Sequence, residues 1–223
     1  MNRIARRSVV TLAICILTAG AAFAHGHHHR KQRSSGGHFD YYVMSLSWSP
    51  SYCATHPHDP TQCGHQGFGF VLHGLWPQYR NGSWPQHCTA QGTPDEATIK
   101  RALAFMPSRH LIEHEWQTHG SCTGLGPDDY FGRADRAFAN VKIPVALRAP
   151  KVSPALSAND LVDAFMQTNP GMTRNMISIA CHDGNELTEV RVCLDKDTLA
   201  PQACSGRVRN SCRYGNLRIP ATH

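Results

Sequence analysis

Two short segments of the sequence concentrate side chains that can transfer protons. The first is His73-Gly-Leu-Trp-Pro-Gln78, and the second is His114-Glu-Trp-Gln-Thr-His-Gly-Ser-Cys122. In the second, Glu115 and His119 share one face of a predicted helix, where a carboxylate can orient an imidazole and raise its pKa. At about pH 6 one imidazole can be protonated while another is neutral. His73 and His119 are therefore a candidate acid–base pair.

Hydrophobic periodicity on both sides of these segments predicts an α+β fold. Strands are expected before and after a central group of helices, and one short apolar run ends at His73-Gly74. The predicted strands cover 42–48, 68–72, 175–181 and 187–194. The predicted helices cover 93–106, 108–119, 128–140 and 157–168.

Capping signals set the starts of the first two helices. Thr93 is the predicted N-cap of the first, and Glu96 closes a capping box with it. The buried face of this helix is predicted to consist of Ile99, Leu103 and Met106. Ser108 is the predicted cap of the helix that carries the second segment, and Trp116 on that helix is interpreted as a core residue.

The N-terminus has the parts of a secretory signal peptide. Three arginines precede the uncharged stretch 8–23, and Ala22-Phe-Ala24 matches a signal-peptidase site. We expect a signal peptide at 1–24, a flexible His-, Ser- and Gly-rich tail at 25–37 and a globular domain at 38–223. The mature protein is then secreted or periplasmic, with no membrane segment.

Composition narrows the class of protein further. With 41% hydrophobic and 17% charged residues, the chain is neither a coiled coil nor strongly charged disorder. Loss of the three N-terminal arginines lowers the net charge from +6 to +3, too little to indicate a polyanion partner by itself. The nine cysteines fall to eight, and an even number outside the cytosol predicts four disulfides whose pairing the spacing leaves open.

His73-Gly-Leu-Trp-Pro and His114-Glu-Trp-x-x-His-Gly-x-Cys122 resemble the two active-site segments of the ribonuclease T2 family of secreted, metal-independent ribonucleases. The stretch Ser47-Trp-Ser-Pro-x-Tyr-Cys53 precedes them in the family's order, and the resemblance covers about 39–214. It implies one disulfide-bonded α+β domain, an antiparallel sheet flanked by helices. It also implies an endoribonuclease acting on RNA with no cofactor and no metal, and we expect a monomer.

The resemblance implies roles for the histidines and the glutamate of the two segments. His119 takes the proton of the 2′-hydroxyl, and His73 gives one to the 5′-oxygen, so that a 2′,3′-cyclic phosphate forms and is later hydrolysed to a 3′-phosphate. His114 binds phosphate, and Glu115 helps to stabilise the pentacovalent phosphorus. The implied disulfides are Cys53–Cys63, Cys88–Cys122, Cys181–Cys212 and Cys193–Cys204.

The sequence departs from the family's pattern beside both segments. Thr118 stands where Lys is usual, so the site has one positive charge fewer unless Arg80 or Arg109 replaces it. On the residues alone, we expect Thr118→Lys to raise kcat/KM about tenfold. Trp76 is implied to stack on a base, and Gln78 stands where some members have Asp. Because an amide both donates and accepts hydrogen bonds, base preference should be weak.

Two alternatives belong to other classes of protein. His110-Leu-Ile-Glu-His114 fits the H-x-x-E-H pattern of inverzincin-type zinc metallopeptidases, with Glu186 or Glu189 as a distant third ligand. EDTA would inactivate such an enzyme and would spare a metal-independent ribonuclease. The other alternative is a catalytically inactive RNA-binding homologue, against which the presence of both His73 and His119 argues.

Overall fold

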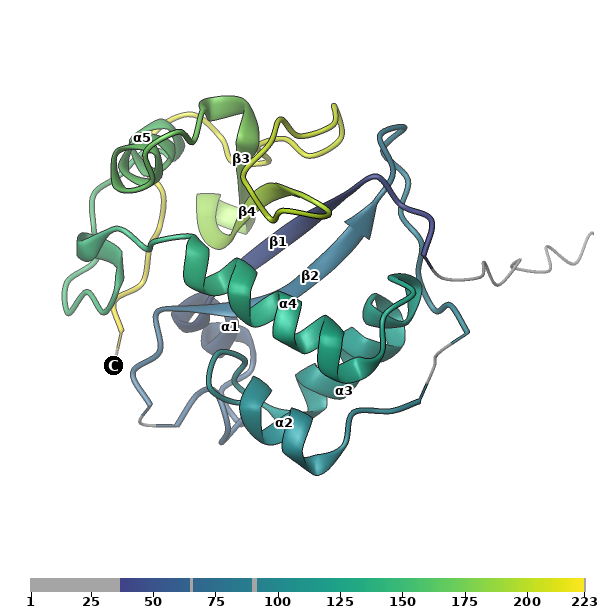
Figure 1. Ribbon diagram of the computed structural model, residues 1–223. Helices are drawn as coiled ribbons and strands as arrows, with labels where there is room; N and C mark the ends of the chain where they lie inside the picture. Colours follow the sequence, from purple (N-terminus) through teal and green to yellow (C-terminus); the bar gives the residue numbers. More distant parts are fainter. Residues whose placement is uncertain (1–36, 65, 90–91, 223) are drawn as a thin grey trace, which may run out of the picture. The chain divides into compact units, whose positions relative to one another are not determined.

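The computed structural model describes residues 37–64, 66–89 and 92–222 (Figure 1). The predicted signal peptide at 1–24 and the predicted tail, apart from Gly37, lie outside the described residues. Within the described ranges, no helix is both long and apolar enough to cross a membrane.

One antiparallel sheet is the centre of the fold. Its strands are β1 (Tyr41–Trp48), β2 (Phe70–Gln78), β3 (Ile177–His182) and β4 (Glu186–Asp195), and their spatial order is β2-β1-β4-β3. The α-helices of the described chain are α1 (Ser49–Thr55), α2 (Glu96–Ala102), α3 (Arg109–Thr118), α4 (Pro127–Asn140) and α5 (Ala158–Thr168). Short 3-10 turns are η1 (Gly120–Cys122), η2 (Val145–Leu147), η3 (Arg174–Met176) and η4 (Asp183–Asn185). The predicted α+β fold is confirmed.

The two faces of the sheet differ in chemistry, because side chains alternate along each strand. One face is apolar and packs against α4, which crosses the sheet in Figure 1, and against α5. Its members on β1 are Tyr42, Met44, Leu46 and Trp48. On the opposite face, called the polar face below, β1 and β4 pair Ser45 with Arg191 and Ser47 with Glu189, next to a small apolar cluster of Tyr41, Val43 and Cys193.

Helix α2 begins later than the sequence predicts. Asp95, not Thr93, is its N-cap, because Oδ1 of Asp95 accepts a hydrogen bond from the backbone N–H of Thr98 (2.7 Å). The helix ends at Ala102, so Leu103 lies beyond it and is 46% exposed. The predicted capping box and the buried position of Leu103 are therefore wrong.

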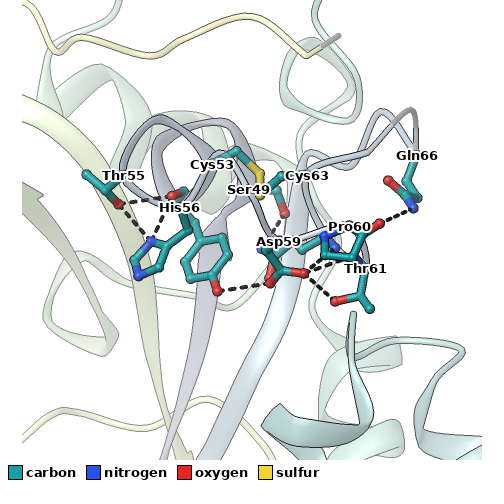
Figure 2. Close-up of a disulfide and its surroundings, with 11 residues drawn as sticks. Ser49, Cys53, Thr55, His56, Asp59, Pro60, Thr61, Cys63 and Gln66 are labelled. Carbon is teal, nitrogen blue, oxygen red and sulfur yellow. Dashed lines mark hydrogen bonds between the residues drawn. A yellow bond between two sulfur atoms is a disulfide. The ribbon is translucent and has the colours of Figure 1, made fainter.

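Four disulfides cross-link the described residues. The pairs are those that the resemblance implies: Cys53–Cys63, Cys88–Cys122, Cys181–Cys212 and Cys193–Cys204. The first closes the loop that follows α1, where Asp59 accepts hydrogen bonds from Tyr52 and Thr61 (Figure 2). This loop forms one wall of a cavity beside His73.

Candidate active site

A β-bulge in β2 places two consecutive residues of the first segment on the polar face. The predicted strand ended at His73-Gly74, whereas β2 continues beyond them and stays paired with β1. Ser45 of β1 pairs with Gly74 and Leu46 pairs with Leu72, so His73 is an extra residue in the ladder. Bulges of this kind redirect a side chain. The bulge brings His73 to the polar face while Leu72 stays in the core.

Helix α3 packs beside β2 and brings the second segment to the same site. The prediction that Ser108 caps this helix is confirmed, since its hydroxyl accepts a backbone N–H of the first turn. Trp116 is 1% exposed and belongs to the core, as predicted. His119 follows the last helical residue, and the Cys88–Cys122 disulfide links the chain just beyond it to the loop after β2.

Polar contacts around His73 join β2, β4 and α3. Nδ1 of His73 lies 2.9 Å from Oε1 of Glu189, and Nε2 lies 3.6 Å from Oε1 of Glu115. The indole N–H of Trp76 donates to Oε2 of Glu115 (2.7 Å). Glu115 is 1% exposed, and its carboxylate is directed at β2.

The indole of Trp76 lies beside both candidate histidines. Its ring centroid is 5.3 Å from that of His73 and 5.4 Å from that of His119. The guanidinium carbon of Arg191 lies 5.6 Å from the centroid of the same indole. Two imidazoles and a permanent cation therefore surround one aromatic ring.

The electrostatics around His73 favour its protonated form. Burial acts to lower the pKa of His73, but the hydrogen bond to Glu189 and the charge of Glu115 outweigh it, and the pKa is raised. Burial also opposes ionisation of Glu189, yet His73 and Arg191 lower the pKa of this carboxyl to about 2. Burial raises the pKa of Glu115 to about 7, against the charge of His73 and the hydrogen bond from Trp76.

His119 is perturbed in the opposite direction. Burial, reinforced by the charge of His73, lowers the pKa of His119 to about 3. Its Nδ1 is buried and has no hydrogen-bond partner among the described residues. Burial lowers the pKa of His114 as well. The expectation that Glu115 raises the pKa of His119 is therefore wrong, because its carboxylate binds Trp76 and faces His73 instead.

Each candidate histidine lines a different cavity. His73 lines one of about 570 Å³, whose polar walls also include Tyr52, Asp59, Gln62, His110 and His114. His119 lines a second of about 380 Å³, together with Trp76, Gln78, Trp84, Thr118, Arg191 and Arg207. Each candidate histidine therefore adjoins a space large enough to hold part of a ligand.

Comparison with known proteins identifies the family. The model of the ribonuclease T2 family matches residues 39–204. The chain belongs to the ribonuclease T2 family. A curated relative named Ribonuclease, from Aeromonas hydrophila, is 37% identical over 183 residues, which cover 79% of this chain and 81% of the relative.

Solved structures of ribonuclease T2 type share the fold. The crystal structure of RNase NT in complex with 5′-AMP is 26% identical, with a TM-score of 0.62 over 82% of this chain and 99% of the other. The RNase-related protein from Calystegia sepium has a TM-score of 0.65 at 22% identity, covering 83% and 98% of the two chains. The second likeness concerns the fold alone.

Three residues lie beside the T2 segments in places that the sequence did not predict, although Glu189 was a candidate zinc ligand of the metallopeptidase alternative. Glu189 binds His73, Arg191 lies over Trp76, and Trp84 lines the cavity of His119. In the predicted strand 187–194, side chains alternate between the two faces, so positions 189 and 191 share a face. No signal in the sequence related that face to His73.

The arrangement of side chains does not support the metallopeptidase alternative. Among the described residues, no three His, Cys, Asp or Glu side chains are grouped so that they could hold a metal ion. Glu189 binds His73 and Arg191, and Glu186 forms an ion pair with Arg218, so neither is placed as a ligand for His110 and His114.

Proposed function

We propose that the protein is an endoribonuclease that cleaves single-stranded RNA by attack of the 2′-hydroxyl on the adjacent phosphate. The observation that carries this proposal is the opposite perturbation of two imidazoles beside one indole. The pKa of His119 is lowered to about 3 and that of His73 is raised, so one is neutral and the other protonated over a wide pH range. General acid–base catalysis needs this pairing.

In the proposed first step, His119 takes the proton of the 2′-hydroxyl while the 2′-oxygen forms a bond to phosphorus. The bond from phosphorus to the 5′-oxygen breaks, and His73 Nε2 gives its proton to that leaving oxygen. The products are a 2′,3′-cyclic phosphate and a 5′-hydroxyl. In the second step the roles reverse: His73 activates a water, His119 protonates the 2′-oxygen, and a 3′-phosphate remains.

Glu115 and His114 support this chemistry from α3. Glu115 is held by Trp76 and lies 3.6 Å from Nε2 of His73, and its proposed role is to stabilise the pentacovalent phosphorus. His114 lines the cavity of His73 and is proposed to bind the phosphate. Trp76 and Gln78 line the other cavity, where we expect a base of the RNA to stack on the indole. Because the amide of Gln78 both donates and accepts hydrogen bonds, the preference among the four bases should be weak.

The products of RNA cleavage test the proposed reaction. We expect 2′,3′-cyclic phosphates to appear first and 3′-phosphates later, because the 2′-oxygen is the nucleophile. Mass spectrometry of a cleaved oligoribonucleotide measures both, with an oligodeoxynucleotide and a 2′-O-methyl oligonucleotide as controls that lack the nucleophile. Cleavage of either control, or products with 5′-phosphates, would contradict the mechanism. Added EDTA should leave the rate unchanged.

The pH dependence of kcat/KM follows from the two histidines of the free enzyme. Activity requires neutral His119, so it is lost as pH falls through about 3, the lowered pKa of His119. It requires protonated His73, so it is lost as pH rises through the raised pKa of His73. We expect a bell centred on the acidic side of neutral when a dinucleotide is assayed at constant ionic strength. A profile that rises through pH 8 would exclude this assignment.

We also propose that the protein acts as a secreted or periplasmic monomer after cleavage behind Ala24. The four disulfides support an oxidising compartment. N-terminal sequencing of the exported protein tests the cleavage site, which should leave His25 as the first residue.

A further inference from the structure

Arg191 is a cation that the sequence did not connect with the reaction. It stands on the polar face of β4, where it pairs with Ser45 of the neighbouring strand. It lines the cavity of about 380 Å³ together with Thr118 and His119, and its guanidinium lies over Trp76.

A single carboxylate connects Arg191 with His73. Oε1 of Glu189 lies 2.9 Å from Nδ1 of His73, while Oε2 accepts from Nε of Arg191 at 2.7 Å and lies 2.6 Å from Nη2. A guanidinium has five N–H groups, and this contact uses one edge of it. Among the described residues Nη1 has no acceptor, so it is available to a ligand, and Glu189 sets the position of the guanidinium relative to the imidazole.

The other cations near the site are less well placed. Arg109 lines the cavity of His73 but not that of His119 and Thr118, and it forms ion pairs with Glu96 and Glu113. Arg80 lines neither cavity. Arg207 lines the same cavity as Arg191, but its side chain lies against Gly82, in the turn after β2. Thr118 is neutral and only 7% exposed.

We propose that Arg191 binds the nonbridging oxygens of the phosphate during cleavage, as the permanent positive charge of the site. Negative charge on these oxygens must be stabilised as the 2′-oxygen attacks, and an arginine offers paired donors for them. This proposal rests on the proposed ribonuclease function. In this proposal Arg191, and not Arg80 or Arg109, supplies the positive charge that a lysine at position 118 would provide.

The test is a double-mutant cycle between Arg191 and Thr118, assayed on an RNA dinucleotide at low salt. Arg191→Met should lower kcat/KM about 10- to 100-fold, the range for a charge-assisted contact. Thr118→Lys should change the wild-type enzyme less than about threefold, because the cation is already present, but should recover about tenfold in the Arg191→Met background. This expectation replaces the gain predicted from the sequence alone.

Matched variants separate a role at the phosphate from a structural one. Arg191→Lys should retain more activity than Arg191→Met, and Arg209→Met controls for the loss of one exposed arginine. The Kd of 3′-AMP should rise about tenfold in Arg191→Met, with thermal unfolding as the measure of folding. If the Met variant unfolds, Arg191→Gln, which keeps a donor for Glu189, takes its place in the cycle.

Two results would overturn the proposal. One is cleavage by Arg191→Met within threefold of wild type, and the other is an equal effect of Thr118→Lys in both backgrounds. A larger loss in Arg207→Met would assign the role to that residue. Failure of the ribonuclease function itself is distinct, because the wild-type protein would then release no cyclic phosphate.

Discussion

Alanine at position 73 or 119 lowers kcat on RNA by about 10³-fold or more, if these histidines are the acid and the base. General acid–base groups each contribute about 10²- to 10⁴-fold, and Ala at 73 also leaves the partly buried Glu189 without its imidazole partner. Steady-state kinetics on a dinucleotide measure the loss. His58→Ala is the control, because His58 is exposed and lines neither cavity.

A change of leaving group distinguishes the acid from the base. A nucleoside 3′-(p-nitrophenyl phosphate) needs no proton on its leaving oxygen. We therefore expect His73→Ala to recover at least tenfold of its loss on this substrate, while His119→Ala remains equally impaired. The reverse pattern would exchange the two roles. Retention of more than a tenth of wild-type kcat by either variant on RNA would refute the pairing.

Gly74→Ala should lower kcat/KM by about 10²-fold, although it adds only one methyl group. A Cβ at this position would lie 2.0 Å from Oε2 of Glu115 and 2.4 Å from Nε1 of Trp76, within the hydrogen bond that joins them. The buried carboxylate must then move, and a lost hydrogen bond of this kind costs about 1–3 kcal/mol. Kinetics and thermal unfolding measure both effects.

Gly206→Ala is the matched control for this substitution. A Cβ there meets no atom within 4 Å, so neither activity nor stability should change appreciably. Wild-type activity in Gly74→Ala would show that the contact between Glu115 and Trp76 is dispensable.

Local signals in the sequence predicted the start of a helix correctly where only one residue could act as its N-cap. No other residue competes with Ser108 to cap helix α3, and this N-cap was predicted correctly. At the start of helix α2, Thr93 and Asp95 are both possible N-caps, and the carboxylate of Asp95 accepts the hydrogen bond from the backbone. The resemblance located the two histidine segments because each is continuous in the chain.

Contacts between distant strands could not be read from the sequence. Glu189 lies 116 residues from His73 in the chain, and its hydrogen bond depends on the pairing of β1 with both β2 and β4. The low pKa of His119 has the same origin, because its main cause is burial by the folded chain rather than Glu115 one turn away.

The bulge makes His73 the one residue of β2 that has no partner on β1 in the paired register. If His73 is left out, the side chains before and after it alternate regularly between the two faces. Val71 and Gly74 pair with residues of the polar face, and Leu72 and Leu75 lie in the core. Deleting His73 outright would therefore leave a regular strand with every other side chain on its original face. If His73 is the acid, as proposed, a three-nucleotide deletion would remove catalysis and keep the paired register of the sheet, so activity and fold can be lost separately.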